Sequence, residues 1–247
     1  MIQKALITGG QQGIGLGIAQ ALHVAGWEVA IAADLPPAAD AVTAALAVMP
    51  GAQYHRHDLC DIASVAAMLD AVGPITTLIS NAGVPAMVRG DLLDMQPDSF
   101  DRCIDVNLRG TFFLAQECAR RMRALPQDPY RSLVFITSVS AAMVSADRAE
   151  YCISKAGAAM MAQAFAARLA PEGIGVFDIR PGIIATPMTA PVAARYDQRI
   201  AEGLVPAQRW GQPADIAQII LPLVRGDFAF STGAIIPVDG GLSIHRL

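Results

Sequence analysis

Tyr151 and Lys155 stand four residues apart within a segment whose apolar spacing is typical of a helix. Residues four apart share one helical face, so the phenol and the ammonium can approach each other. The unperturbed pKa of tyrosine is about 10, and a neighbouring positive charge favours the phenolate. The spacing therefore indicates a general acid/base, although it also occurs by chance on exposed helix faces.

Ser138 supplies a hydroxyl for the same site. It closes the apolar run of residues 132–138, which predicts the strand that precedes the helix of Tyr151. At the end of that strand the hydroxyl can hydrogen-bond a substrate oxygen on which charge develops during hydride transfer. Together the three side chains predict an acid/base, its electrostatic partner and an orienting group.

A glycine-rich turn at residues 8–15 has the pattern TGxxxGxG and joins the first predicted strand to the first helix. Glycines let a backbone turn tightly and approach a pyrophosphate, while the amides and the dipole of a helix N-terminus hold anionic phosphates. The other interpretation is a plain tight turn that needs positive φ.

Asp34 closes the second predicted strand, 19 residues after Gly15. A carboxylate at about this offset binds the ribose hydroxyls of an adenine dinucleotide. It would repel a 2'-phosphate, and neither Gln12 nor Leu35 brings a compensating positive charge, so the sequence predicts NAD(H) in preference to NADP(H). The alternative for Asp34 is a capping or turn aspartate.

Apolar runs and helical spacings alternate along the chain. Strands are predicted at residues 5–8, 28–33, 53–57, 76–80, 132–138, 174–180 and 235–238, and helices at residues 14–25, 38–49, 62–72, 97–122, 150–170 and 214–224. This alternation predicts an α/β fold, a doubly wound parallel sheet with helices on both faces, formed by one domain over residues 1–247. Ligands of such sheets bind beyond the carboxyl ends of the strands.

Composition excludes several other classes of protein. Hydrophobic residues make up 53% of the 247 residues, which is too apolar for a disordered chain. The net charge of −4, without a basic cluster, argues against nucleic-acid binding. The sequence contains no run of about 18 apolar residues, the length that a membrane-spanning helix requires. The four cysteines lack metal-ligand spacing, so we expect reduced thiols, no metal site and a cytoplasmic location.

Taken together, these residues resemble the classical short-chain dehydrogenase/reductase family, and the resemblance spans essentially the whole chain. The matching motifs are Thr8-Gly9-xxx-Gly13-x-Gly15, Asn81-Ala82-Gly83, Asn107, Ser138, Tyr151-xxx-Lys155 and Pro181-Gly182. The resemblance implies a Rossmann fold, and within the family the chain is most similar to the 3-oxoacyl-acyl carrier protein reductase group.

The resemblance also implies a role for each motif. Asn107, Ser138, Tyr151 and Lys155 would form a catalytic tetrad, in which Asn107 supports a water of a proton relay from Lys155 and an oxidised nicotinamide adds a second positive charge near Tyr151. Asp58 and Leu59 would contact adenine, and Ile184 and Thr186 would hold the carboxamide. The expected cofactor-binding residues are Gly9, Gln12, Gly13, Ile14, Gly15, Asp34, Asp58, Leu59, Asn81, Ala82, Gly83, Tyr151, Lys155, Pro181, Gly182, Ile184 and Thr186.

The substrate pocket is expected between the loops that follow the fifth and sixth strands. Met143, Ile183 and Met188 predict a mostly apolar wall, and a segment at about residues 185–208 resembles the family's mobile substrate lid. Arg148 can reach a carboxylate or phosphate of the substrate, or it forms a solvent-facing or interface ion pair.

The helices predicted over residues 100–122 and 150–170 carry apolar residues on more than one face, more than one buried stripe requires. Packing against a second subunit would cover the excess, and the family resemblance implies a homotetramer.

The leading hypothesis is an NAD(H)-dependent oxidoreductase that moves hydride between nicotinamide and a secondary alcohol or ketone, with small-molecule substrates. Its alternatives are a 3-oxoacyl-acyl carrier protein reductase proper, and a non-catalytic sensor that keeps only the dinucleotide fold. An epimerase or dehydratase of the extended relatives is disfavoured, because the turn reads TGxxxGxG and not TGxxGxxG.

Overall fold

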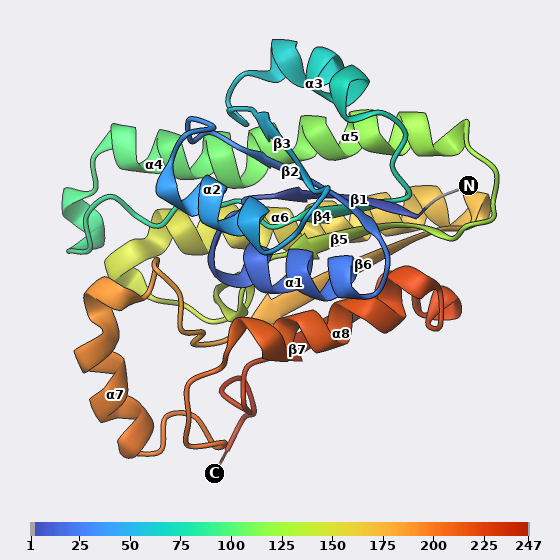
Figure 1. Ribbon diagram of the computed structural model, residues 1–247. Coiled ribbons are helices and arrows are strands. Elements are labelled where there is room, and N and C mark those ends of the chain that lie inside the picture. The colour runs from blue at the N-terminus through green and yellow to red at the C-terminus, as the bar shows by residue number, and fades with distance from the viewer. Residues whose placement is uncertain (1–2, 247) are drawn as a thin grey trace.

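Apolar runs of the chain form one parallel seven-stranded sheet in the computed structural model, which describes residues 3–246 (Figure 1). The spatial order of the strands is β3-β2-β1-β4-β5-β6-β7. Their bounds are β1 Lys4–Thr8, β2 Glu28–Ala33, β3 Gln53–Arg56, β4 Thr77–Ser80, β5 Arg131–Ile136, β6 Ile174–Pro181 and β7 Ile235–Val238. The predicted doubly wound parallel sheet is confirmed.

Helices cover both faces of this sheet, as Figure 1 shows. They are α1 Gly13–Val24, α2 Asp40–Ala47, α3 Val65–Val72, α4 Pro97–Ile104, α5 Thr111–Arg123, α6 Ala149–Leu169, α7 Ala193–Ala201 and α8 Pro213–Arg225. The start of α8 shows how sequence sets a helix boundary: Pro213 is its first residue, and Gln212 and Asp215 form a reciprocal capping box.

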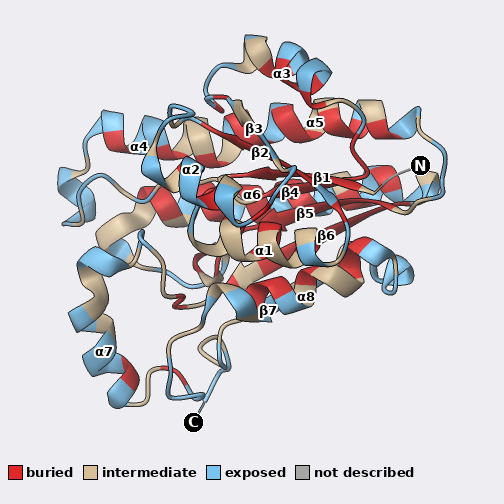
Figure 2. Cartoon of the chain, viewed as in Figure 1, coloured by how far each residue is buried: buried red, intermediate tan, exposed pale blue. Residues whose placement is uncertain are grey.

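The central strands are buried on both faces, so the sheet is red in Figure 2. On one face, Leu78 and Leu133 pack with residues of α3, α5 and α6. On the other, Ile79 and Val134 pack with residues of α1 and α8. Strands buried on both faces form the rigid part of the sheet, and the residues beyond the strand ends are available for function.

The strand order reverses between β1 and β4, which makes the carboxyl ends of these strands the expected ligand crevice. Hydrogen bonds fix the two ends together. The Thr8 hydroxyl accepts from the backbone N–H of Asn81 at 2.9 Å and of Ala82 at 3.0 Å. The Asn81 side chain donates in turn to the Thr8 carbonyl at 2.9 Å.

The prediction of one continuous helix over residues 97–122 is wrong. The segment is α4, then a π-helical turn at Asp105–Gly110, then α5. A β-carbon on Gly110 would collide with the Leu59 carbonyl, so this glycine lets the widened turn approach the loop after β3. The wider turn carries Asn107.

Other boundaries differ from prediction in smaller ways. The strand of residues 132–138 ends at Ile136, because the Ser138 hydroxyl accepts from the Ser140 N–H and caps the next short turn. Asp34 is the first residue after β2 and not its last. The helix α7 lies within the expected lid and was not predicted, because Ile200 is its one buried side chain.

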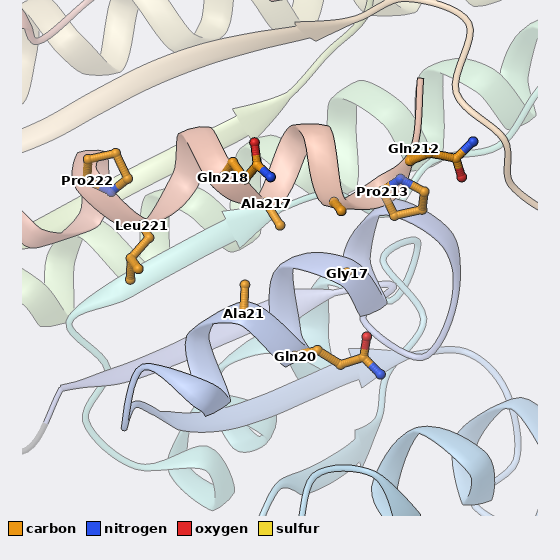
Figure 3. A pocket seen from close by; sticks show the side chains of 10 residues that line it. Gly17, Gln20, Ala21, Gln212, Pro213, Ala217, Gln218, Leu221 and Pro222 are labelled. Carbon is orange, nitrogen blue, oxygen red and sulfur yellow. The ribbon is translucent and has the colours of Figure 1, made fainter. Parts of the chain in front are cut away.

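Within residues 3–246, no helix combines the length and the apolar character that a membrane crossing demands. A groove of about 610 Å³ lies between α1 and α8, where side chains such as Ala21 and Ala217 face each other (Figure 3). None of the predicted catalytic or cofactor residues lines it, so the chemistry has to be sought at the strand ends.

Candidate active site

The glycine turn forms a backbone cradle after β1. Gly9 and Gly13 have φ of 66° and 56°, a region that glycine enters without strain. A β-carbon on Gly15 would clash with the Gly9 carbonyl and lie 2.6 Å from the Asn81 amide nitrogen. Because α1 begins at Gly13, its unpaired first-turn N–H groups lie at this turn. A cradle this close to backbone fits the pyrophosphate of a dinucleotide.

The predicted carboxamide-binding residues lie beside this cradle. A β-carbon on Gly13 would be 3.3 Å from Cβ of Thr186, so the loop after β6 reaches the glycine turn. Pro181 ends β6, and the Gly182 N–H donates to the Val238 carbonyl at 3.0 Å. Ile184 is buried and bridges to Gly211.

Asp34 is exposed just beyond β2, next to a basic residue that the sequence interpretation did not consider. Arg56, the last residue of β3, donates from Nε to the Asp34 carbonyl at 3.1 Å. Asp58 is exposed and accepts from the Cys60 N–H at 2.9 Å, while Leu59 is buried. The predicted ribose and adenine residues therefore gather at the ends of β2 and β3.

Asn107 is buried in the π-helical turn and ties three segments together. Its Oδ1 accepts from the Val84 N–H at 2.7 Å, and its amide donates to the Val84 carbonyl at 3.0 Å. The same amide donates to Ser154 Oγ at 3.0 Å, on the helix that carries Tyr151 and Lys155. Sequence reasoning missed Ser154, although its place three residues after Tyr151 puts it on a neighbouring part of that helix.

Lys155 lies in the same buried cluster, with 6% of its surface exposed. Its Nζ donates to the Ile136 carbonyl at 3.1 Å. Burial lowers the pKa of its ammonium to about 8, against an opposing effect of the Asp178 carboxylate. A β-carbon on Gly83 would lie 3.1 Å from Asn107 Oδ1 and 3.4 Å from Lys155 Nζ, so the motif after β4 borders the tetrad.

Tyr151 is buried beside these groups. Burial has the largest effect on the phenol and raises its pKa. The Arg148 guanidinium and the interaction with the Ser138 side chain lower the pKa and so oppose the effect of burial. The sequence interpretation named Lys155 as the electrostatic partner of this phenol. Its Nζ is 5.8 Å from the ring centre, whereas the guanidinium carbon of Arg148 is 5.1 Å away.

The four predicted substrate residues lie in different surroundings. Ile183 is buried with Ile200 and Val205 beneath α7, whereas Met143 and Met188 are exposed on their loops. Arg148 lies against Tyr151 and donates from Nη2 to Ser140 Oγ at 3.1 Å.

The expected lid segment is tied to the loop before Tyr151. Asp147 Oδ2 forms ion pairs with Arg195 Nη1 of α7 at 3.6 Å and with Arg89 Nη1 at 3.7 Å. Across residues 3–246, His, Cys, Asp and Glu side chains form no group of three suited to a metal ion.

Comparisons with known proteins find similarity over nearly the whole chain. Residues 9–243 match the family model described as Enoyl-(Acyl carrier protein) reductase. The chain is 33% identical to the 3-oxoacyl-[acyl-carrier-protein] reductase MabA of Mycobacterium tuberculosis, covering 98% of this chain and 93% of that protein.

Two solved structures are also similar. A 3-oxoacyl-[acyl-carrier protein] reductase from Brucella melitensis in complex with NAD has a TM-score of 0.93 and 46% identity, covering 100% and 99% of the two chains. A putative 2-deoxy-d-gluconate 3-dehydrogenase from Agrobacterium tumefaciens with bound NADP has a TM-score of 0.87 and 32% identity, covering 98% and 97%.

A doubly wound sheet with a glycine cradle and a buried Tyr-Lys-Ser-Asn cluster defines a nicotinamide-dependent oxidoreductase that acts on CH–OH groups. The chain belongs to the short-chain dehydrogenase/reductase family, which confirms the resemblance drawn from its motifs. Within that family it is similar to the 3-oxoacyl-acyl carrier protein reductases.

Proposed function

We propose that the protein moves hydride between NAD(H) and a secondary alcohol or ketone, with Tyr151 as the general acid/base. The observation that carries this proposal is the convergence of Tyr151, Lys155, Ser138 and Asn107 next to the glycine cradle. Gly83 connects the two parts. It borders Asn107 and Lys155, and it lies two residues after Asn81, which borders Gly15.

In the direction of oxidation, Tyr151 accepts the proton of the substrate hydroxyl while the Ser138 hydroxyl orients the same oxygen. Lys155 stabilises the phenolate electrostatically and binds the nicotinamide ribose. The bound nicotinamide supplies the hydride acceptor, or the donor in the reverse direction. Asn107 supports the water through which the proton leaves Lys155. Burial of the cluster excludes bulk water, which strengthens each of these electrostatic interactions.

The preference for NAD(H) is supported by Asp34. Its exposed carboxylate follows β2, where it can bind ribose hydroxyls and would repel a 2'-phosphate. Arg56 brings a positive charge nearby, but its Nε is engaged with the Asp34 carbonyl. We therefore infer that Asp34, and not Arg56, determines the cofactor preference.

A second candidate is a 3-oxoacyl-acyl carrier protein reductase proper, because the similar proteins from Mycobacterium and Brucella carry that name. Both candidates use the same tetrad and differ in substrate. A non-catalytic sensor is disfavoured, since a sensor has no need of a buried tyrosine between two cations.

One experiment separates these functions. The protein is mixed with NAD⁺ and a panel of polyols, sugars and hydroxyacyl esters, and with NADH and 3-oxoacyl thioesters, while absorbance of the reduced cofactor is followed. Turnover of a simple alcohol supports the leading proposal, and turnover confined to acyl thioesters supports the second. Tight NADH binding without turnover of any substrate would support the sensor.

We also propose a homotetramer in the reducing cytoplasm, where the four free cysteines remain thiols. Large apolar side chains lie exposed on the two long helices: Phe112 and Phe113 on α5, and Ile153 and Met160 on α6. Burying them between subunits removes apolar surface from water. Light scattering at micromolar concentration should give about four times the 25.9 kDa chain mass; a monomeric mass would reject the assembly.

A further inference from the structure

Arg148 lies closer to the Tyr151 ring than Lys155 does, and the tetrad does not include it. We propose that Arg148 is a positioning residue: its fixed positive charge favours the Tyr151 phenolate, and its hydrogen bond steadies the turn that carries Ser138. This inference rests on the proposed role of Tyr151 as acid/base. It differs from the role expected from sequence, in which Arg148 contacts an anionic substrate.

The backbone places Arg148 for this task. It is the N-cap of α6, one helical turn before Tyr151, and its N–H donates to the Ser145 carbonyl at 3.1 Å. This position directs the side chain along the start of α6, where the guanidinium carbon is 5.1 Å from the ring centre. A guanidinium within about 6 Å of an aromatic ring is held by cation–π attraction.

A chain of hydrogen bonds links Arg148 to Ser138. The guanidinium donates to Ser140 Oγ at 3.1 Å, and the Ser140 N–H donates to Ser138 Oγ at 3.0 Å. Ser138 is also the hydroxyl whose interaction with Tyr151 lowers the pKa of the phenol. The guanidinium therefore joins the start of α6 to the turn after β5, the two elements between which a substrate oxygen has to be placed.

The charge of Arg148 acts on two neighbours, the Tyr151 phenol and the adjacent Asp147 carboxylate. Within residues 3–246 it forms no ion pair, and its Nε is buried without a hydrogen-bond partner in the same range. The neighbouring carboxylate of Asp147 faces Arg89 and Arg195 instead. A half-buried cation without an ion pair keeps much of its effect on the nearby ring.

Ionisable groups face Tyr151 from several elements. Arg148 at the N-cap of α6, Cys152 on α6 and Cys103 on α4 shift its pKa. Lys155 of α6 lies 5.8 Å from the ring centre, and Asp178 of β6 acts on Lys155. Arg148 has the largest of the pKa-lowering effects that oppose burial. Because burial lowers the pKa of Lys155 to about 8, Lys155 loses its charge at alkaline pH, whereas a guanidinium stays protonated.

The test compares three variants. Arg148→Met removes the charge and keeps much of the length, Arg148→Lys keeps a charge, and Arg120→Met is the matched control on the exposed side of α5. Near-ultraviolet tyrosinate absorbance is titrated with and without NAD⁺, and the same protein carrying Tyr151→Phe is subtracted. This measurement isolates the Tyr151 phenol and needs no turnover. The pH profile of kcat is measured with a neutral and an acidic alcohol.

We expect Arg148→Met to raise the pKa of Tyr151 by about one unit and to lower kcat near neutral pH by about tenfold, equally for both alcohols. Arg148→Lys should recover most of this loss, and Arg120→Met should behave as the wild type. An unchanged Tyr151 titration in Arg148→Met, or a KM increase confined to acidic alcohols, would overturn the proposal. Absence of turnover in the wild type would refute the proposed function alone, because the titration still measures the effect of Arg148.

Discussion

The side-chain amide of Asn107 donates to Ser154 Oγ at 3.0 Å, which ties the π-helical turn to the helix of Tyr151 and Lys155. Asn107→Ala would remove this bond and leave the buried Val84 N–H and carbonyl without their partner. We expect the free energy of unfolding to fall by about 1–3 kcal/mol. Ser154→Ala, which keeps both Val84 bonds, should cost about 1 kcal/mol or less. Denaturant titration at one protein concentration measures both, and equal stability of Asn107→Ala and wild type would contradict this account.

Gly110→Ala tests the approach of the π-helical turn to Leu59. The added methyl group would collide with the Leu59 carbonyl, so the turn has to shift and move Asn107. We expect a loss of about 1–3 kcal/mol in stability together with a reduced kcat.

The matched control for Gly110→Ala is Gly26→Ala, after α1. Gly26 has open space around it and a φ of 87°, so alanine there costs about 1 kcal/mol through backbone strain alone. Its kcat should not change. An equal reduction of kcat in both variants would show that the π-helical turn has no special role in catalysis.

Lys155 predicts a specific pH dependence of stability. Its pKa falls from 10.5 to about 8 on folding, so between these values the unfolded chain binds more protons than the folded one. Stability due to this residue therefore rises with pH through that window. Relative to Lys155→Met, which has no charge to bury, the wild type should gain about 2 kcal/mol between pH 7 and 10. A stability difference that stays constant over this range would mean that Lys155 is not titrating as a buried amine.

Asp34→Asn tests the cofactor preference, because it removes the carboxylate charge and keeps the side-chain shape. We expect the dissociation constant of NADH to rise and that of NADPH to fall, each by about tenfold, since repulsion of the 2'-phosphate is gone and Arg56 lies nearby. Fluorescence titration of both reduced cofactors measures this. Asp40→Asn, at the exposed start of α2, is the control. Unchanged selectivity in Asp34→Asn would assign the preference to other residues.

Much of this architecture is readable from local pattern. The strands β4 and β5 contain apolar segments without polar alternation, at residues 78–79 and 133–136, and the glycine turn separates β1 from α1. The sheet and its carboxyl-end crevice therefore follow from the local sequence pattern. The pairing of Tyr151 with Lys155 follows from helical spacing alone.

The features that could not be predicted depend on contacts between distant segments. The π-helical turn exists where Gly110 meets Leu59, which lies on another loop. The helix α7 buries one side chain, Ile200, which leaves too little apolar pattern to detect. Arg56 and Arg148 acquire their roles from neighbours across space, Asp34 in one case and the Ser140 turn in the other.

The most direct test of the central claim is Tyr151→Phe, assayed on an alcohol that the wild type oxidises with NAD⁺. The substitution removes the phenolic oxygen and leaves the ring, so NADH affinity should stay near that of the wild type. We predict that kcat falls by about 10²–10⁴-fold, the usual contribution of a positioned acid/base. Oxidation at an undiminished rate would contradict the assignment of Tyr151 and the mechanism built on it.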